Sequence, residues 1–322
     1  MSSPPESSLQ LNLGPMLPAL LAVQVAKRLG LAKPVVRAAL RHMFREKRRA
    51  RAFRGYTPSK RDVFVATFAK SGTNWMMQIA QQITWRGAAE FGHIHQLVPW
   101  PDAPGTGLVG LHETSAADAS PTSLRVIKTH LAPAFVPYCE EATYLTLLRD
   151  PKEVVVSAYY FLGGMIGVLD RLSIDDWFDL SLAQGGLLDG WAEHTAGFWA
   201  WRERANVLVL GYGEVKQEPT RCIQQVASAM GVELTGEQFE RVLERASFEY
   251  MQAHEAQFAP PRMPFMKEEA RPKMVRRGTS GGSGELLSRA QQAEIDHTSQ
   301  ARLRQLGSDF PYASFFEGVD SA

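Results

Sequence analysis

A short polar segment between an expected strand and an expected helix carries the side chains best suited to binding a phosphate. The segment consists of Lys70, Ser71, Gly72, Thr73, Asn74 and Trp75. A glycine-containing loop that leads into a helix turns backbone N–H groups and the helix N-terminus toward an anion. Nucleoside triphosphatases place the lysine after the last glycine of such a loop, whereas Lys70 precedes Gly72. The segment therefore predicts a site for a 5′-phosphate outside a triphosphate, and a capped helix without a ligand is the plainer alternative.

Two more side chains that could do chemistry lie two residues apart at the end of a second expected strand. They are Lys128 and His130, which follow the apolar pair Val126 and Ile127. Residues i and i+2 of a strand project from the same face, so the ammonium and the imidazole point the same way. An imidazole with its usual pKa of about 6.5 can take a proton from a hydroxyl at neutral pH. A lone histidine is more often a hydrogen-bonding core residue, but the neighbouring lysine favours His130 as a general base.

A third expected strand ends at Arg149, and Ser157 lies about two turns into the helix that follows it. A guanidinium and a hydroxyl at this spacing can hold one phosphate between them. Arg149 also has alternative partners, because Asp150 and Glu153 are close enough in the sequence to form an ion pair with it.

These residues require a framework in which several strands end at the same edge of a sheet. Apolar runs at 62–68, 124–128, 143–148 and 207–210 are expected strands, and helical segments follow the first and third. Strands that alternate with helices predict an α/β fold, with one central parallel sheet flanked by helices and chemistry at its carboxyl edge. Residues 87–123 lack periodicity and are expected to form a loop, in which His93, His95 and His112 are interpreted as surface or acceptor-side residues.

Segment 69–75 resembles the 5′-phosphosulfate loop of the cytosolic sulfotransferases that use 3′-phosphoadenosine 5′-phosphosulfate (PAPS). Further matches follow in order: the strand end 126–131, the 3′-phosphate signature 148–157, the cleft helix with Gly190, Trp191, His194 and Trp199, the adenine segments 212–214 and 247–251, and the basic loop at 276–278. Because six matches occur in order over about residues 60–285, the chain is identified as a member of this family.

The resemblance implies a P-loop-kinase-like sulfotransferase fold and in-line transfer of a sulfonate group from PAPS to a hydroxyl or amine, without a metal. Lys70 would meet the charge on the leaving oxygen, Lys128 would steady the sulfonate oxygens and His130 would take the acceptor proton. The residues implied to bind PAPS and its product, 3′-phosphoadenosine 5′-phosphate, are Lys70, Ser71, Gly72, Thr73, Asn74, Trp75, Arg149, Ser157, Tyr212, Ser247, Phe248, Met251, Arg276, Arg277 and Gly278. The candidate acceptor residues, which suggest a lipophilic alcohol or phenol, are Trp100, Phe135, Tyr159, Tyr160 and Phe161.

The sequence departs from the family pattern at three places. Ala69 stands where the family has proline, and Asn74 stands where it has threonine; both changes are mild. The tryptophan of the C-terminal loop is missing, and Ser283 stands near its place among four glycines in 278–284. A looser lid over the donor is therefore expected, and the C-terminal dimerisation segment is in doubt.

The first 54 residues differ from the remainder of the chain in charge. They hold eleven lysines and arginines against Glu6 and Glu46, about +9 in a chain whose formal net charge is +1. Residues 1–10 are expected to be disordered, and apolar residues at helical spacing predict two helices, from Met16 to Leu29 and from Pro34 onward. This basic amphipathic extension, 1–54, precedes a single sulfotransferase domain, 55–322. Its apolar stripes either dock on that domain, the favoured interpretation, or lie on an anionic membrane.

Composition narrows the remaining possibilities. The chain has only two cysteines, Cys139 and Cys222, which argues against a disulfide framework and favours a cytoplasmic location. Peripheral contact with a membrane is a further option for the localisation. No apolar run is long enough to span a bilayer, and no secretion signal is recognised. The expected partner is a small acceptor rather than a nucleic acid, for a monomer or a homodimer. The alternatives are a small-molecule kinase and a membrane-docked nucleotide-binding protein without catalysis.

Overall fold

The computed structural model describes residues 17–103, 108–260, 272–274 and 282–316, and a four-stranded sheet forms its centre. The strands are β1 (Asp62–Ala66), β2 (Arg125–Thr129), β3 (Thr143–Leu148) and β4 (Val207–Gly211). They lie in the order β2-β1-β3-β4, and every neighbouring pair is parallel. The expected parallel α/β sheet is thus confirmed, and its four carboxyl ends share one edge.

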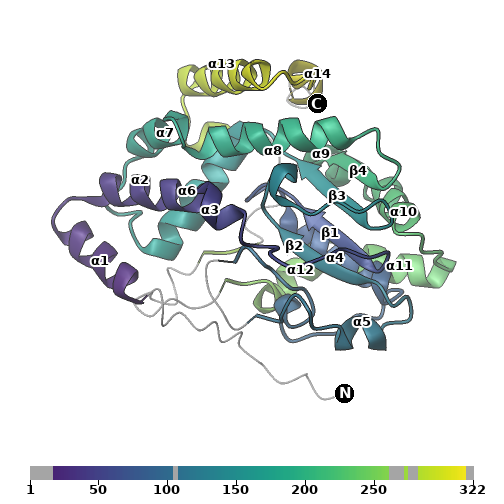
Figure 1. The fold of residues 1–322 in the computed structure, drawn as a ribbon. Coiled ribbons are helices and arrows are strands. Elements are labelled where there is room, and N and C mark those ends of the chain that lie inside the picture. Colours follow the sequence, from purple (N-terminus) through teal and green to yellow (C-terminus); the bar gives the residue numbers. More distant parts are fainter. Residues whose placement is uncertain (1–16, 104–107, 261–271, 275–281, 317–322) are drawn as a thin grey trace.

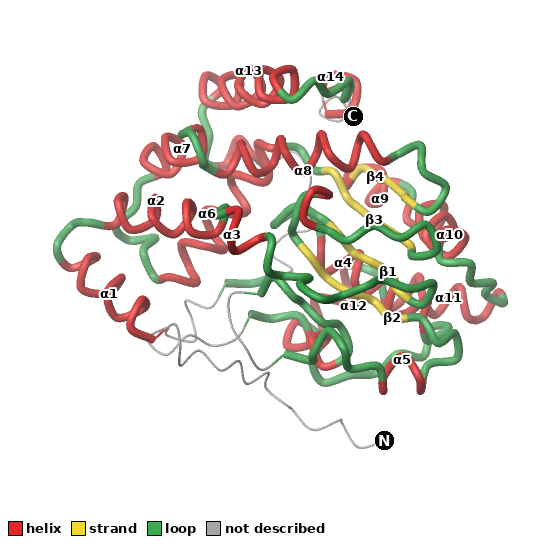
Figure 2. The backbone as a smooth tube through the Cα atoms, in the orientation of Figure 1, coloured by secondary structure: helices red, strands yellow, loops and turns green. Residues whose placement is uncertain are grey.

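Helices cover both faces of this sheet (Figure 1). One face carries α4 (Thr73–Thr84), α10 (Pro219–Ala229) and α11 (Gly236–Arg245), and the other carries α8 (Leu187–Trp201), with α6 (Pro151–Ile166) and α7 (Ile174–Leu182) packed against it. The remaining helices are α1 (Leu17–Arg28), α2 (Ala32–Met43), α3 (Glu46–Arg49), α5 (Ser115–Ala119), α9 (Tyr212–Gln217), α12 (Phe248–Ala253), α13 (Arg289–Gln305) and α14 (Tyr312–Phe316). Single 3-10 turns lie at Ile94–Gln96, Pro133–Phe135, Glu255–Gln257 and Gly282–Glu285. Figure 2 shows that the segment between α4 and β2 is mostly loop, as expected.

The strands are buried on both faces because their side chains alternate between two hydrophobic clusters. Val63 and Val65 of β1 pack with α4 in one cluster, together with Leu145 of β3. Phe64 points to the opposite face and stacks on Tyr144, with ring centroids 4.9 Å apart. Since successive residues of a strand face opposite sides, this two-sided burial fixes the register of the sheet and the direction of every strand end.

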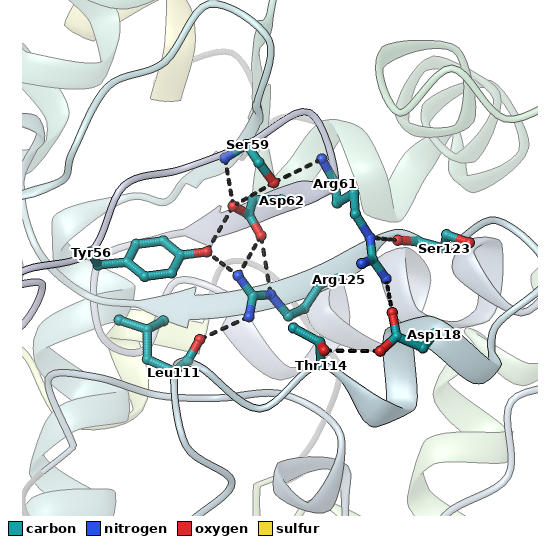
Figure 3. Close-up of polar contacts among 9 residues, drawn as sticks. All are labelled: Tyr56, Ser59, Arg61, Asp62, Leu111, Thr114, Asp118, Ser123 and Arg125. Carbon is teal, nitrogen blue, oxygen red and sulfur yellow. Dashed lines mark hydrogen bonds and ion pairs between the residues drawn. The ribbon is translucent and has the colours of Figure 1, made fainter.

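A polar network closes the amino-terminal edge of the sheet (Figure 3). Asp62 and Arg125 begin β1 and β2, are register partners, and form an ion pair of 2.7 Å that is almost fully buried. Tyr56 donates to the same carboxylate at 2.7 Å, and the Leu111 carbonyl accepts from Arg125 at 2.8 Å. The neighbouring Arg61 pairs with an exposed carboxylate (Figure 3). This network lies at the end of the strands opposite the one that carries the motifs, so we assign it a structural role.

The two expected N-terminal helices are present, but the apolar stripe of one is buried and that of the other is exposed. Val36 and Leu40 of α2 are buried in the hydrophobic cluster that contains α6, α7 and α8, so this stripe docks on the body. Leu21 and Val25 of α1 are exposed instead, as is Leu29 directly after the helix. The favoured interpretation therefore holds for α2 and is wrong for α1. Within the described part of the chain, no helix combines the length and apolar character needed to cross a bilayer.

Candidate active site

A cavity of about 1360 Å³ opens at the carboxyl edge of the sheet. Each strand delivers a polar or aromatic wall residue: Lys70 follows β1, Lys128 lies in β2, Arg149 follows β3 and Tyr212 follows β4. Ligands of open α/β sheets bind in the crevice outside the carboxyl ends of the strands. The cavity has a polar part around residues 70–75 and an apolar part beneath the N-terminal helices.

The loop between β1 and α4 fits a phosphate by its backbone as well as its side chains. Lys70 and Gly72 both have left-handed backbones, with φ of 69° and 93°. A Cβ on Gly72 would lie 2.9 Å from Cδ2 of Tyr212, so only glycine allows this close approach. The N-cap of α4 is Gly72, which has no side chain to cap the first amides of the helix, and the buried hydroxyl of Ser71 has no hydrogen-bond partner among the described residues. Unsatisfied donors at a helix N-terminus form an anion site.

Arg149 is held in place at the floor of the polar part. Its Nε donates to Glu153 at 2.9 Å, its Nη1 donates to the carbonyl of Lys70 at 2.8 Å, and its guanidinium lies 4.4 Å from the ring centroid of Tyr212. The alternative ion pair with Glu153 is therefore present. It does not remove Arg149 from the cavity, whose wall also includes Ser157. The ion pair fixes the direction of the guanidinium. A fixed direction favours phosphate binding, because arginine binds phosphate through directional N–H groups.

Two aromatic side chains meet beside the phosphate loop and line the cavity. The rings of Trp75 and Tyr212 meet edge to face with centroids 5.7 Å apart, and Nε1 of Trp75 donates to the carbonyl of Ala246 at 2.8 Å. The other predicted donor-site residues that line the cavity are Gly72, Thr73, Asn74, Ser247, Phe248 and Met251. Apolar walls next to cations suit a nucleotide, whose base is flat and whose phosphates are charged.

His130 is held in the tautomer that a general base requires. Its Nδ1 lies 2.9 Å from the carbonyl oxygen of Thr67, which can only accept a hydrogen bond, so Nδ1 carries the proton and Nε2 does not. Its backbone amide donates to Asp102 at 3.1 Å. Burial lowers the pKa of His130 to about 3; the nearby charges of Lys128 and Lys70 lower it further, and the bond to Thr67 opposes them. The imidazole is thus neutral at physiological pH in the protein without a bound donor.

Lys128 lies in a tight cage of aromatic rings. Its Nζ is 3.4 Å from the centroid of the Trp100 ring and 3.4 Å from Nε2 of His95. Burial lowers the pKa of Lys128 to about 7, with Lys70 adding to the shift and Asp102 opposing it. Lys128 is therefore close to the point at which small changes in its surroundings decide its charge.

A chain of hydrogen bonds fixes the orientation of His95. The Nδ1 atom of His95 lies 3.0 Å from the carbonyl of Val98, so it carries the proton and leaves Nε2 as an acceptor for Lys128. The amide of His95 donates to Nδ1 of His93 at 3.2 Å, and Nε2 of His93 lies 3.0 Å from the carbonyl of Ala259. Both histidines line the cavity. Both histidines come from the aperiodic segment 87–123, which carries no sequence signal for the contact between His95 and Lys128.

The apolar part of the cavity is built from residues far apart in the sequence. Its walls include Val23, Val35, Ala39, Met43, Phe44, Phe68, Trp100, Leu108, Phe161, Leu162, Met165 and Ile166. Of the candidate acceptor residues, Trp100 and Phe161 are among them, and Nζ of Lys70 lies 3.9 Å from the ring centroid of Phe161. Phe135, Tyr159 and Tyr160 are not among the wall residues. Phe135 stacks under Arg49 instead, and the hydroxyl of Tyr159 donates to the carbonyl of Leu172.

Three predicted donor-site residues, Arg276, Arg277 and Gly278, lie outside the described residues. Ser283, which stands near the place of the missing tryptophan, is described and buried, and its hydroxyl donates to Gln292 of α13 at 2.9 Å. A small polar residue tied to α13 thus occupies this position. Within the described ranges, no three histidine, cysteine or carboxylate side chains are grouped to hold a metal ion.

Comparisons with known proteins agree with this geometry. Residues 60–307 match the family model described as the sulfotransferase domain. The chain is 28% identical to human sulfotransferase 2A1 over 260 residues, 78% of this chain and 87% of that protein. It is 28% identical to the 3-alpha-hydroxysteroid sulfotransferase of Cavia porcellus over 198 residues, 60% of this chain and 67% of that protein. A structure of retinol dehydratase with retinol and PAP shares the fold, with a TM-score of 0.66, 19% identity and coverage of 83% of this chain and 87% of that one. A structure of mouse sulfotransferase SULT7A1 with PAP also shares the fold, with a TM-score of 0.61 and 17% identity. The match covers 86% of this chain and 95% of that one.

Proposed function

This chain belongs to the sulfotransferase domain family, and on that premise we propose which of its residues bind the donor, which transfer the group and what acceptor it takes. As a member of the family it transfers a sulfonate group from PAPS to a small acceptor. The P-loop-like sulfotransferase fold inferred from the motifs is confirmed by the structural neighbours. These findings favour catalysis over the kinase and the binding-only alternatives.

The donor residues are those that meet at the polar part of the cavity. The amides at the start of α4 would hold the 5′-phosphate, joined by the buried hydroxyl of Ser71, which is not itself among the wall residues, and Arg149 with Ser157 would hold the 3′-phosphate. Trp75 and Tyr212, which contact each other and line the cavity, would form one wall against the adenine ring. The fit rests on donors that the protein leaves unsatisfied and on the close approach that Gly72 permits.

The transfer step is carried by Lys70, Lys128 and His130, which line one cavity wall. When bound, PAPS supplies an activated sulfonate whose bond to the 5′-phosphate oxygen breaks as the acceptor oxygen attacks sulfur. His130 accepts the hydroxyl proton at Nε2, Lys128 stabilises the sulfonate oxygens, and Lys70 meets the charge on the leaving oxygen. The negative charge of a bound donor offsets the two lysines that lower the pKa of His130, so its basicity rises when it is needed.

The acceptor is a lipophilic alcohol or phenol. The observation that supports this class is the wall around the acceptor side of His130, which is formed by aliphatic, methionine and aromatic side chains from α1, α2 and α6. Such a wall binds through area removed from water and orients the ligand with few polar groups. The name of the guinea pig relative, a hydroxysteroid sulfotransferase, is consistent with this class.

The proposal is tested by combining turnover with donor binding. We expect His130→Ala to lose at least about 100-fold in kcat, since general-base catalysis contributes about 100- to 10,000-fold. Binding of 3′-phosphoadenosine 5′-phosphate, measured by calorimetry with adenosine monophosphate as the control, should be unchanged. Turnover retained in His130→Ala would remove this histidine from the mechanism. Equal binding of the two nucleotides would show that the donor site is assigned wrongly.

Two further expectations concern surroundings rather than chemistry. We propose that the enzyme works in the cytoplasm, because its cysteines are free, and that the extension contacts an anionic membrane. The described part of the extension, 17–54, exposes seven cationic side chains against one carboxylate, Glu46. The cations are Arg28, Arg37, Arg41, Arg45, Lys47, Arg51 and Arg54.

The oligomeric state, monomer or homodimer, would be decided by sedimentation velocity.

A further inference from the structure

The exposed large apolar side chains of this protein are concentrated in one region. Seven are exposed among the described residues, and five of them lie on α1, on the turn after it and on the turn after α6. The five are Leu21, Val25, Leu29, Leu31 and Leu169. Their side chains reach 68% exposure at Leu29. Exposed apolar residues scattered singly need no explanation, whereas a contiguous group of them marks an interaction surface.

The orientation of α1 is set by polar contacts on its inner face. Gln24 and Lys27 donate to the carbonyls of Ile166 and Gly167 at 3.3 and 2.6 Å, and Lys27 also pairs with Asp170 at 2.7 Å. Val23, which follows Leu21 by two positions and so lies across the helix from it, lines the cavity. The apolar stripe is therefore held outward by specific bonds, and α1 lies at the margin of the molecule, away from the sheet (Figure 1).

Charge decides between the occupants that such a stripe could meet. Arg28 lies seven positions after Leu21 and three after Val25, which places it beside the stripe on the same face of the helix. The described part of the extension that carries the stripe exposes seven cations against one carboxylate, Glu46. A second copy of this chain, paired through the same surface, would bring these like charges together. An anionic bilayer attracts each of them and also accepts leucine and valine side chains at its interface.

We propose that the outer face of α1, with Leu31 and Leu169, docks on an anionic phospholipid bilayer and places the apolar part of the cavity beside it. The inner face of α1 is a wall of that cavity, so one helix thickness, about 10 Å, separates the bilayer surface from the acceptor site. The inference rests on the proposed lipophilic acceptor, which partitions into bilayers and reaches this site by a short path.

The test is co-sedimentation of the full chain with phosphatidylcholine vesicles that contain about 30% phosphatidylserine, an amount that gives a negative surface potential. The triple variant Leu21→Ser, Val25→Ser and Leu29→Ser removes the stripe at exposed positions. The matched control is Leu306→Ser, whose side chain is 52% exposed at the end of α13. Calorimetry with 3′-phosphoadenosine 5′-phosphate reports the donor site independently of docking. The double variant Val25→Ser and Leu29→Ser replaces the triple variant if that one does not fold.

We expect the wild-type chain and Leu306→Ser to sediment with anionic vesicles and to release at high salt. The stripe variant should partition at least about tenfold more weakly, because three side chains lose their transfer into the interface. A wild-type chain that stays in the supernatant overturns the proposal, as does a stripe variant that binds equally well. A stripe variant that converts a dimer to a monomer would assign the surface to a second copy and overturn it too. Normal nucleotide binding with failed docking leaves the proposed sulfonate transfer and its donor site intact, and refutes only the membrane contact.

Discussion

The Nζ atom of Lys128 lies 3.4 Å from Nε2 of His95, a nitrogen that can only accept because Nδ1 of the same ring donates to Val98. The other charged or titratable groups that face Lys128 are Lys70, Asp102 and His130. His95 is therefore a neutral acceptor beside an ammonium whose pKa is lowered to about 7. This contact favours the charged form of Lys128, the form that we propose stabilises the sulfonate oxygens.

Replacing His95 should shift the pH dependence of turnover. The charged form of Lys128 is present below its pKa and lost above it, so activity should fall as the pH rises through that pKa. His95→Phe removes the acceptor, lowers the pKa of Lys128 further and moves this fall to lower pH. We expect kcat at neutral pH to drop about tenfold, the value of one charge-assisted hydrogen bond of about 1.5 kcal/mol.

A full pH–rate profile separates this effect from a general loss of structure. His95→Gln retains an acceptor and should recover part of the activity and of the profile. If His95→Phe lowers kcat equally at every pH, His95 does not act through Lys128.

Arg149 should discriminate between nucleotides with and without a 3′-phosphate. Its guanidinium is held by Glu153 and the carbonyl of Lys70 at the polar end of the cavity. We expect Arg149→Ala to weaken binding of 3′-phosphoadenosine 5′-phosphate by about 10- to 150-fold, since a hydrogen-bonded charge contributes about 1.5–3 kcal/mol. Binding of adenosine monophosphate should not change.

Calorimetry with both nucleotides provides the measurement, and Arg202→Ala is the control. Arg202 also pairs with a carboxylate, that of Asp309, but does not line the cavity. Equal losses for the two nucleotides in Arg149→Ala would place Arg149 in folding rather than in recognition of the 3′-phosphate.

The strands and the residues at their carboxyl ends were predictable because the relevant signals are local. β-Branched and aromatic runs define β1 to β3, and Lys70, Lys128 and Arg149 follow or end them. The prediction of acceptor residues on α6 is only partly right, because Phe161 lines the cavity and Tyr159 and Tyr160 do not. Ser157 and Phe161 are four positions apart and share the cavity face, whereas Tyr159, two positions from Ser157, projects elsewhere. Helical spacing therefore indicates which residues of α6 face the cavity, whereas aromatic character alone does not.

Other features could not be obtained from one sequence. His95 reaches Lys128 from an aperiodic loop, across a distance in the chain that no local pattern encodes. The apolar stripe that begins on α1 faces solvent instead of docking on the domain. Amphipathic spacing shows that a helix has an apolar face, but it does not show what that face contacts. Only the bonds of Gln24 and Lys27 to the end of α6 determine that it points outward.

Gly72→Ala should damage donor binding more than it damages stability. At φ of 93° any added Cβ is strained, which costs about 1–2 kcal/mol. The new methyl would also lie 2.9 Å from Tyr212 and 3.0 Å from Leu147, so Tyr212 must move away from its proposed place beside the adenine ring. We expect at least about a tenfold loss in affinity for 3′-phosphoadenosine 5′-phosphate, given that 1.4 kcal/mol corresponds to one factor of ten.

The matched control for this substitution is Gly30→Ala. Gly30 has a similar φ of 73°, and a Cβ there meets nothing within 4 Å. The midpoint temperature of thermal unfolding should fall in both variants, because both force an alanine into a left-handed backbone, whereas calorimetry should show normal nucleotide binding in Gly30→Ala only. Equal binding in both would mean that the close approach of Tyr212 to Gly72 is not needed by the donor site.

The ion pair between Asp62 and Arg125 should stabilise the sheet without affecting chemistry. Both side chains are buried at the amino-terminal edge, 10% exposed at most, so Arg125→Met leaves a carboxylate without its charged partner. We expect a loss of about 3–5 kcal/mol in the free energy of unfolding, as for other buried pairs that lose one member. Adding Asp62→Leu should recover part of this loss, because the double variant leaves no buried charge. Urea unfolding of the wild type, Arg125→Met, Asp62→Leu and the double variant measures the coupling. The kcat of the fraction that remains folded should equal that of the wild type, since the pair lies at the opposite end of the strands from Lys128 and His130. A fall in kcat without a fall in stability would assign the network a role in catalysis.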